Sequence, residues 1–136
     1  MSASNGIRWG RVLLGGFLVE LALTLLSMPL FLLGGFEAVL VVIAPLCFIV
    51  AFLVSWWILR RAPSRGALHG FLIGVVTTVI YLGLNFAMSG SLGQIIEMYG
   101  PLLFFLANGL RVAGAIAGGA FAQRSVSEAH RIPMHE

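Results

Sequence analysis

Residues 12–33 read VLLGGFLVELALTLLSMPLFLL, an apolar run of about 22 residues that contains a single ionisable side chain, Glu20. At 1.5 Å of rise per residue, a helix of this length crosses the roughly 30 Å hydrocarbon core of a bilayer. The run is about twice as long as the apolar core of a secretory signal, and no A-x-A cleavage pattern follows it. We therefore interpret it as a retained membrane helix.

Three further apolar runs of similar length follow, at residues 38–59, 67–88 and 101–122. Hydrophobic residues make up 60% of the chain and charged residues 10%, and the mean hydropathy is +1.03, which is typical of an integral membrane protein. The sequence predicts an all-α membrane protein with the lipid bilayer as its principal partner. Its single domain is expected to be a bundle of four transmembrane helices, followed by a tail at residues 123–136.

The arginines predict the orientation of this bundle. Between the predicted helices, the first and third connections contain only Glu37 and Glu97 as charged residues. Cytoplasmic flanks of membrane helices are enriched in basic residues, so we expect both termini and the tail to be cytoplasmic in a multi-pass protein of the cell membrane. So strong a bias disfavours the dual-topology small multidrug-resistance transporters and fluoride channels. The flanking arginines, all on one side, are Arg8, Arg11, Arg60, Arg61, Arg65, Arg124 and Arg131.

The composition excludes several kinds of chemistry. The chain contains no Lys, which rules out lysine-dependent covalent chemistry, and a lone Cys47 cannot form an intramolecular disulfide. The three histidines, His69, His130 and His135, lie at a helix end or in the tail, where they cannot supply paired intramembrane haem ligands. We predict no cofactor, no metal site and no nucleic-acid partner, because helix flanks account for the sequence pI near 10.

The two halves of the chain resemble each other. An offset of 54 aligns residues 16–18 (Gly-Phe-Leu) with residues 70–72, and an offset of 56 aligns residues 44–51 with residues 100–107. The pattern predicts a tandem, parallel repeat of a helical hairpin, related by an axis along the membrane normal. Matches of this kind also arise by chance in apolar sequence.

Residues 91–100 interrupt this pattern between the third and fourth runs. They include Ile95, Ile96 and Met98 and are long enough for two helical turns. We expect a short helix that lies flat at the outer interface.

Each predicted transmembrane helix carries one stripe of small or polar residues at helical spacing. Lipid provides no hydrophobic drive for helices to associate, so close approach at small residues and interhelical hydrogen bonds must hold the bundle together. The stripes therefore mark the inward faces. They are Gly16, Glu20, Thr24 and Ser27; Ala44, Cys47, Ala51 and Ser55; Gly66, Gly70, Gly74, Thr78, Tyr81 and Asn85; and Asn108, Arg111, Ala115, Gly118 and Ala122.

Four glycines in these stripes are predicted to pack helices. Gly66, Gly70 and Gly74 are spaced by four, and Gly118 lies in the fourth run. Small-x-x-x-small patterns are common in membrane helices, so packing within the monomer or between protomers is favoured over a ligand-binding role.

Two ionisable residues are predicted near the middle of the bilayer. Glu20 lies about 12 Å, and Arg111 about 16 Å, from the cytoplasmic ends of their helices. A lone charge at this depth costs about 2.5 to 3.5 kcal/mol on insertion scales, so the two residues are natural partners. The pair is interpreted equally well as a buried salt bridge or as a functional site, and Asn108, one turn from Arg111, can hydrogen-bond either member.

A family resemblance rests on glycines. Gly15 and Gly16, residues 70–74 (GFLIG) and residues 115–119 (AIAGG) look like the pattern of a group of uncharacterised small bacterial membrane proteins with four spans. The resemblance implies a location in the bacterial inner membrane. It carries no known activity and no functional residues.

Two classes of function remain open from the sequence. The first is a channel or transporter for an ion or small solute, acting as a homo-oligomer, with Glu20, Arg111 and Asn108 as a gate or binding site. The alternative is a structural or accessory subunit that docks with partner membrane subunits and has no transport activity of its own. An enzyme is disfavoured, because the spans offer no metal cluster, nucleophile–base pair or paired carboxylates.

Overall fold

The computed structural model describes residues 6–61 and 65–129 and places them almost entirely in helices. The predicted tail residues 130–136, with His130, Arg131, His135 and Glu136, lie outside the described residues. Within the described part there is no strand, which agrees with the predicted all-α class. The helices are α1 (Trp9–Leu59), α2 (Gly66–Ser89), α3 (Leu92–Tyr99) and α4 (Pro101–Ala129).

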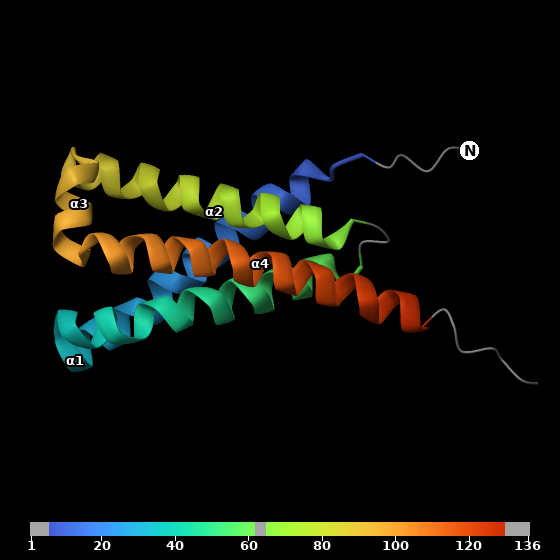
Figure 1. Ribbon diagram of the computed structural model, residues 1–136, viewed down its shortest axis with the longest axis horizontal. Coiled ribbons are helices and arrows are strands. Elements are labelled where there is room, and N and C mark those ends of the chain that lie inside the picture. The colour runs from blue at the N-terminus through green and yellow to red at the C-terminus, as the bar shows by residue number, and fades with distance from the viewer. Residues whose placement is uncertain (1–5, 62–64, 130–136) are drawn as a thin grey trace, which may run out of the picture.

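Helix α1 is broken at Gly35 and folds back on itself (Figure 1). Gly35 has φ 69° and ψ −169°, a backbone conformation that a residue with a Cβ rarely adopts. The break divides α1 into a first arm, residues 9–34, and a second arm, residues 36–59. The predicted connection at residues 34–37 is thereby reduced to one non-helical residue, because helical geometry continues on both sides of it.

Two other glycines separate the remaining helices. Gly90, with φ 72°, caps α2 by donating its N–H to the carbonyl of Phe86, and Gly100, with φ 79°, precedes Pro101 at the start of α4. Between them α3 runs from the end of α2 to the start of α4 as the short helix that the sequence predicts (Figure 1). At its other end α4 continues to Ala129, so residues 123–129 of the predicted tail are helical.

The start of α1, the end of its second arm, the start of α2 and the end of α4 lie at one end of the molecule (Figure 1). The Arg8 N–H donates to His69 Nε2 at 3.2 Å, and His69 Nδ1 lies 2.9 Å from the Arg65 carbonyl oxygen. Because Nε2 accepts, the ring proton resides on Nδ1. We call this the basic end; it carries Arg8, Arg11, Arg60, Arg61, Arg65 and Arg124.

Within the described residues, three helices, α1, α2 and α4, are long and apolar enough to cross a membrane, whereas α3 has only eight residues. The outward faces are covered by large apolar side chains, which suits a lipid environment. Examples are Leu13, Phe17, Leu25, Val79, Phe105 and Phe121, each at least half exposed.

The predicted packing glycines lie where helix backbones approach most closely. A Cβ at Gly66 would collide with the carbonyl oxygen of Gly119, one at Gly70 with that of Ala115, and one at Gly118 with that of Phe52. At Gly74 a Cβ would lie 2.8 Å from the Cα of Val112. These contacts occupy the half of the bundle next to the basic end, which is therefore packed backbone against backbone.

The packing register differs from the offsets of the predicted hairpin repeat. Gly114 packs on Phe48 and Gly118 on Phe52, so the second arm and α4 pair residues about 66 apart rather than 56. The difference of ten residues corresponds to about 15 Å along a helix axis. The contacts between the second arm and α4 therefore do not follow the aligned residues of the two halves.

We expect Gly70→Leu to destabilise the protein strongly, because the new side chain must displace the α4 backbone at Ala115. Gly83→Leu on the same helix is the matched control, since a Cβ there meets nothing within 4 Å. Thermal unfolding in detergent should show a large drop in midpoint for the first variant and little change for the second. Equal midpoints for the two variants would contradict the packing role of Gly70.

Candidate functional site

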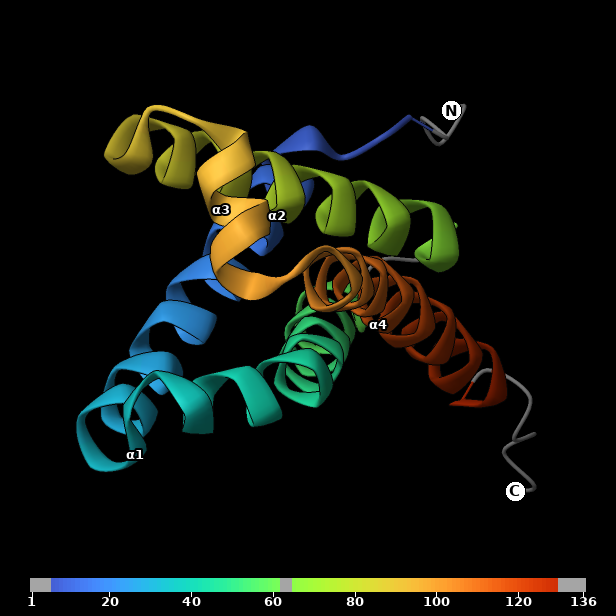
Figure 2. The ribbon, with the colours of Figure 1, turned by 60° about the vertical axis from the view of Figure 1, so that its left-hand side comes forward.

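At the end of the molecule away from the basic end, the tip of α1 lies apart from α2 and α3 (Figure 2). A cavity of about 780 Å³ lies between these helices and α4. Its walls come from residues 20–43 of α1, residues 81–88 of α2, residues 103–111 of α4, and Tyr99. None of the packing glycines lines it. The tightly packed half of the bundle thus forms the closed floor of a cavity that occupies the other half.

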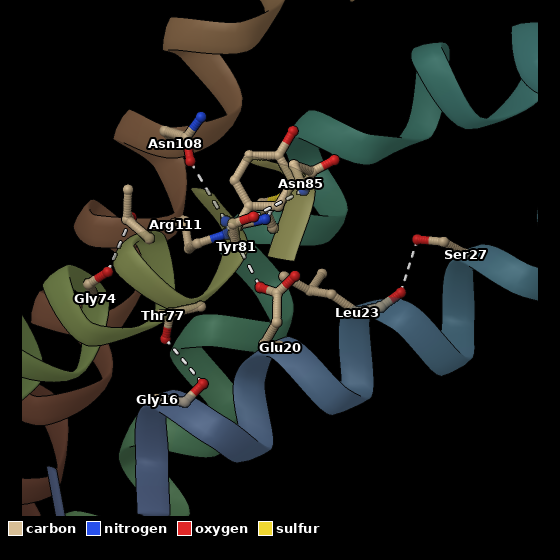
Figure 3. Close-up of polar contacts among 12 residues, drawn as sticks. Gly16, Glu20, Leu23, Ser27, Gly74, Thr77, Tyr81, Asn85, Asn108 and Arg111 are labelled. Atoms are coloured by element: carbon tan, nitrogen blue, oxygen red, sulfur yellow. Dashed lines mark hydrogen bonds and ion pairs between the residues drawn. The ribbon is translucent and has the colours of Figure 1, made fainter. Parts of the chain in front are cut away.

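Arg111 and Glu20 meet at this floor (Figure 3). Arg111 Nη1 lies 3.7 Å from Glu20 Oε2, and the exposed fractions of the two side chains are 4% and 11%. The structure therefore brings together the two charges that the sequence places at similar depth. Their separation exceeds the 2.7–2.9 Å of a short charge-assisted hydrogen bond, so the pair is loose.

Three further groups surround the guanidinium. Nη1 donates to Asn108 Oδ1 at 3.4 Å, and Nη2 donates to Cys47 Sγ at 3.7 Å. The ring of Tyr81 lies 4.5 Å from the guanidinium carbon, a cation–π contact (Figure 3). Arg111 thus contacts side chains of the second arm, α2 and α4 in addition to Glu20 of the first arm.

Close packing below the floor fixes these positions. One turn before Glu20, the carbonyl of Gly16 accepts a hydrogen bond from Thr77 Oγ1 at 3.2 Å, and this joins the first arm to α2. One turn after Arg111, Ala115 lies against Gly70 of α2. Each charge is therefore held by a backbone contact about 6 Å away along its helix.

Two atoms at the floor lack hydrogen-bond partners. Within residues 6–61 and 65–129, Glu20 Oε2 and Arg111 Nε are both buried and make no hydrogen bond. A partly satisfied polar network in a low-dielectric interior is costly, and a proton, water or ligand group can supply the missing partners.

The sequence-predicted residues fall into two groups. Glu20, Arg111 and Asn108 are neighbours at the cavity floor, whereas Gly66, Gly70, Gly74 and Gly118 lie below it in the packed half. Cys47 and Tyr81 belong to the predicted inward stripes, but no sequence signal indicated that both would contact Arg111. The link between His69 and Arg8 was likewise unforeseen, because it depends on how two distant helix ends meet.

Comparison with protein-family models, with curated proteins and with solved structures returns no match for this chain. The resemblance to small four-span bacterial proteins thus rests on the glycine pattern alone. In the part of the chain that the structure describes, no three His, Cys, Asp or Glu side chains lie close enough to hold a metal ion.

We expect Glu20→Gln and Arg111→Gln each to lower the free energy of unfolding by about 3 kcal/mol, because each leaves the other charge buried without its partner. The double variant should cost less than the sum of the two. Denaturant titration in detergent measures all three, and Glu37→Gln, at an exposed position, serves as the control. Additive single effects would show that the two charges do not interact.

Proposed function

We propose that the chain is a membrane carrier for a small amphipathic solute, which binds in the cavity with its polar group at Glu20 and Arg111. The observation that carries this proposal is a large, mostly apolar cavity whose closed end holds a loose charged pair. Ligand sites typically combine apolar walls with a few convergent polar groups, and ionisable residues at membrane depth commonly mark transport pathways.

The proposed membrane arrangement has four crossings. The first and second arms of α1 are about 39 Å and 36 Å long, so each alone exceeds the hydrocarbon thickness. With α2 and α4 they make four spans, and the arginines of the basic end favour a cytoplasmic location for both termini. In this orientation the cavity occupies the outer half of the bilayer.

A carrier is favoured over an open channel by the packed half of the bundle. Between the cavity floor and the basic end, helices approach at Gly70, Gly74 and Gly118 with no room for a Cβ. A channel needs a continuous path, whereas a carrier exposes its site to one side at a time. The arrangement corresponds to a state in which the site is closed toward the basic end.

The solute is expected to be amphipathic because the cavity rim is apolar. Met28 and Phe31 of the first arm face the cavity together with Leu84 and Met88 of α2, and all four are exposed. Such a rim between two helices favours entry from the lipid phase over entry of a strongly hydrated ion.

A second candidate, a structural or accessory subunit of a larger membrane complex, is favoured by small residues on the outer face of α4. Gly109 and Ala113 are exposed and spaced by four, and a Cβ at Gly109 would meet nothing within 4 Å. Such a surface allows another helix to approach closely. On the accessory reading, the purified chain transports nothing by itself.

Single cysteines in a Cys47→Ala background should report the topology. With a membrane-impermeant maleimide on intact cells, we expect Glu37→Cys and Glu97→Cys to be labelled, and Arg61→Cys to be labelled only after permeabilisation. All three positions are exposed. Protection of Glu37→Cys together with Arg61→Cys would mean that α1 does not cross the membrane twice.

Transport is tested with two permanently charged amphiphiles of equal chain length, octanesulfonate and octyltrimethylammonium, loaded into proteoliposomes. We expect one of them to leave faster than from protein-free vesicles. Ala107→Trp should abolish this efflux because Ala107 lines the cavity. Leu106→Trp, on the exposed face of the same helix and outside the cavity lining, is the control and should retain efflux. If both ions leave the proteoliposomes no faster than they leave protein-free vesicles, the carrier function is refuted.

A further inference from the structure

The charges at the cavity floor constrain what the site can bind. An arginine side chain stays protonated in proteins, whereas a glutamate can be charged or neutral. With Glu20 ionised, the empty site carries one positive and one negative charge and is neutral overall. Because net charge at membrane depth is costly, a solute that binds here must leave the site neutral again.

From this charge balance we propose that the site binds a monoanionic amphiphile together with one proton. The inference rests on the proposed carrier function and names its substrate class. The proton comes from water that reaches the cavity and is bound by the Glu20 carboxylate. The anionic group of the solute then becomes the counter-charge of Arg111. The loaded site contains a neutral Glu20, one cation and one anion, and is again neutral.

A cationic solute does not satisfy the same balance. To pair with a cation, Glu20 must leave Arg111, and the floor then holds two positive charges and one negative charge. Glu20 is the only carboxylate among the described residues that line the cavity, so no second anion is at hand. An anion that binds without a proton leaves the site with two negative charges and one positive charge.

The contacts of Arg111 suit an incoming anion. Its hydrogen bonds to Asn108 and Cys47 are long, at 3.4 and 3.7 Å, and Nη1 faces Glu20 across 3.7 Å. Tyr81 covers a face of the guanidinium and leaves the N–H groups at its edge for acceptors. When Glu20 is protonated, the oxygens of an anionic group can take the donors that the carboxylate releases.

Glu20 is the group expected to exchange the proton. The titratable or charged groups around it are Arg111 on α4, Cys47 on the second arm, Tyr81 on α2 and Tyr99 on α3. Burial raises the pKa of the Tyr99 phenol, which therefore stays neutral near pH 7. Thiols and phenols are ordinarily neutral there as well. Arg111 stays charged throughout.

Octanesulfonate is a suitable probe because a sulfonate does not bind a proton near neutral pH. Any proton taken up with it must therefore be bound by the protein. In wild-type proteoliposomes, a pH gradient should drive its accumulation on the alkaline side by about tenfold per pH unit, since one proton accompanies each anion. A potassium diffusion potential set with valinomycin should leave the accumulation unchanged.

Glu20→Gln, which resembles the protonated carboxyl, separates the proton step from anion binding. Its empty site carries one net positive charge, so the variant should still transport octanesulfonate but respond to the diffusion potential and lose the response to pH. Glu37→Gln is the control and should behave as wild type. If Glu20→Gln does not fold, the proton stoichiometry can be measured on the wild-type protein in nanodiscs. Octanesulfonate is added in a weakly buffered solution, and the rise in pH, corrected for the change seen with empty nanodiscs, gives the number of protons taken up.

Three results would overturn the inference while leaving the carrier function intact. They are transport of octyltrimethylammonium in place of octanesulfonate, octanesulfonate transport that responds to voltage in the wild type, and binding without proton uptake. Transport of neither ion refutes the carrier function itself, and the two failures are therefore distinguishable.

Discussion

The guanidinium of Arg111 is the constraint on which the rest of the structure depends. It cannot be neutralised by losing a proton, and it lies ten residues into α4, far from either end of that helix. A bundle that contains it must bring acceptors and a counter-charge to it from the neighbouring helices. Glu20, Cys47 and Tyr81 come from three different helical segments, so the position of this one group ties together the first arm, the second arm and α2.

Glycine packing and the cavity are two results of one helix arrangement. Where Gly66, Gly70 and Gly74 face α4, the helices touch through their backbones. Beyond that region the inward positions carry larger side chains, such as Tyr81 and Phe104, whose rings lie 6.4 Å apart, and the helices separate. The tight half gives the floor its rigidity, and the open half leaves room above it. A site that is fixed on one side and borders a cavity on the other follows from this gradient in side-chain size.

The sequence predicted the class of fold and the approximate position of the charged pair, because hydropathy and helical rise determine depth in a membrane. The depth of a residue can be calculated from its own helix alone. The contacts of Cys47 and Tyr81 with Arg111 depend on the rotation and register of several helices, which no single segment encodes. The hairpin repeat was inferred from aligned residues, and the register set by Gly114 and Gly118 differs from that alignment. The cavity depends on how far the helices diverge, and this was not foreseen either.

The break at Gly35 has a consequence for how the chain enters the membrane. The two arms of α1 are joined by one non-helical residue, and the only charged side chain near the turn is Glu37. With the proposed orientation, the segment that must pass through the apolar core during synthesis is short and contains no basic residue, which lowers the cost of moving it. Such a tight turn also prevents the arms from separating widely during insertion. The first two crossings are therefore expected to be inserted as one unit, with the carboxylate of Glu20 already inside the bilayer before Arg111 has been synthesised.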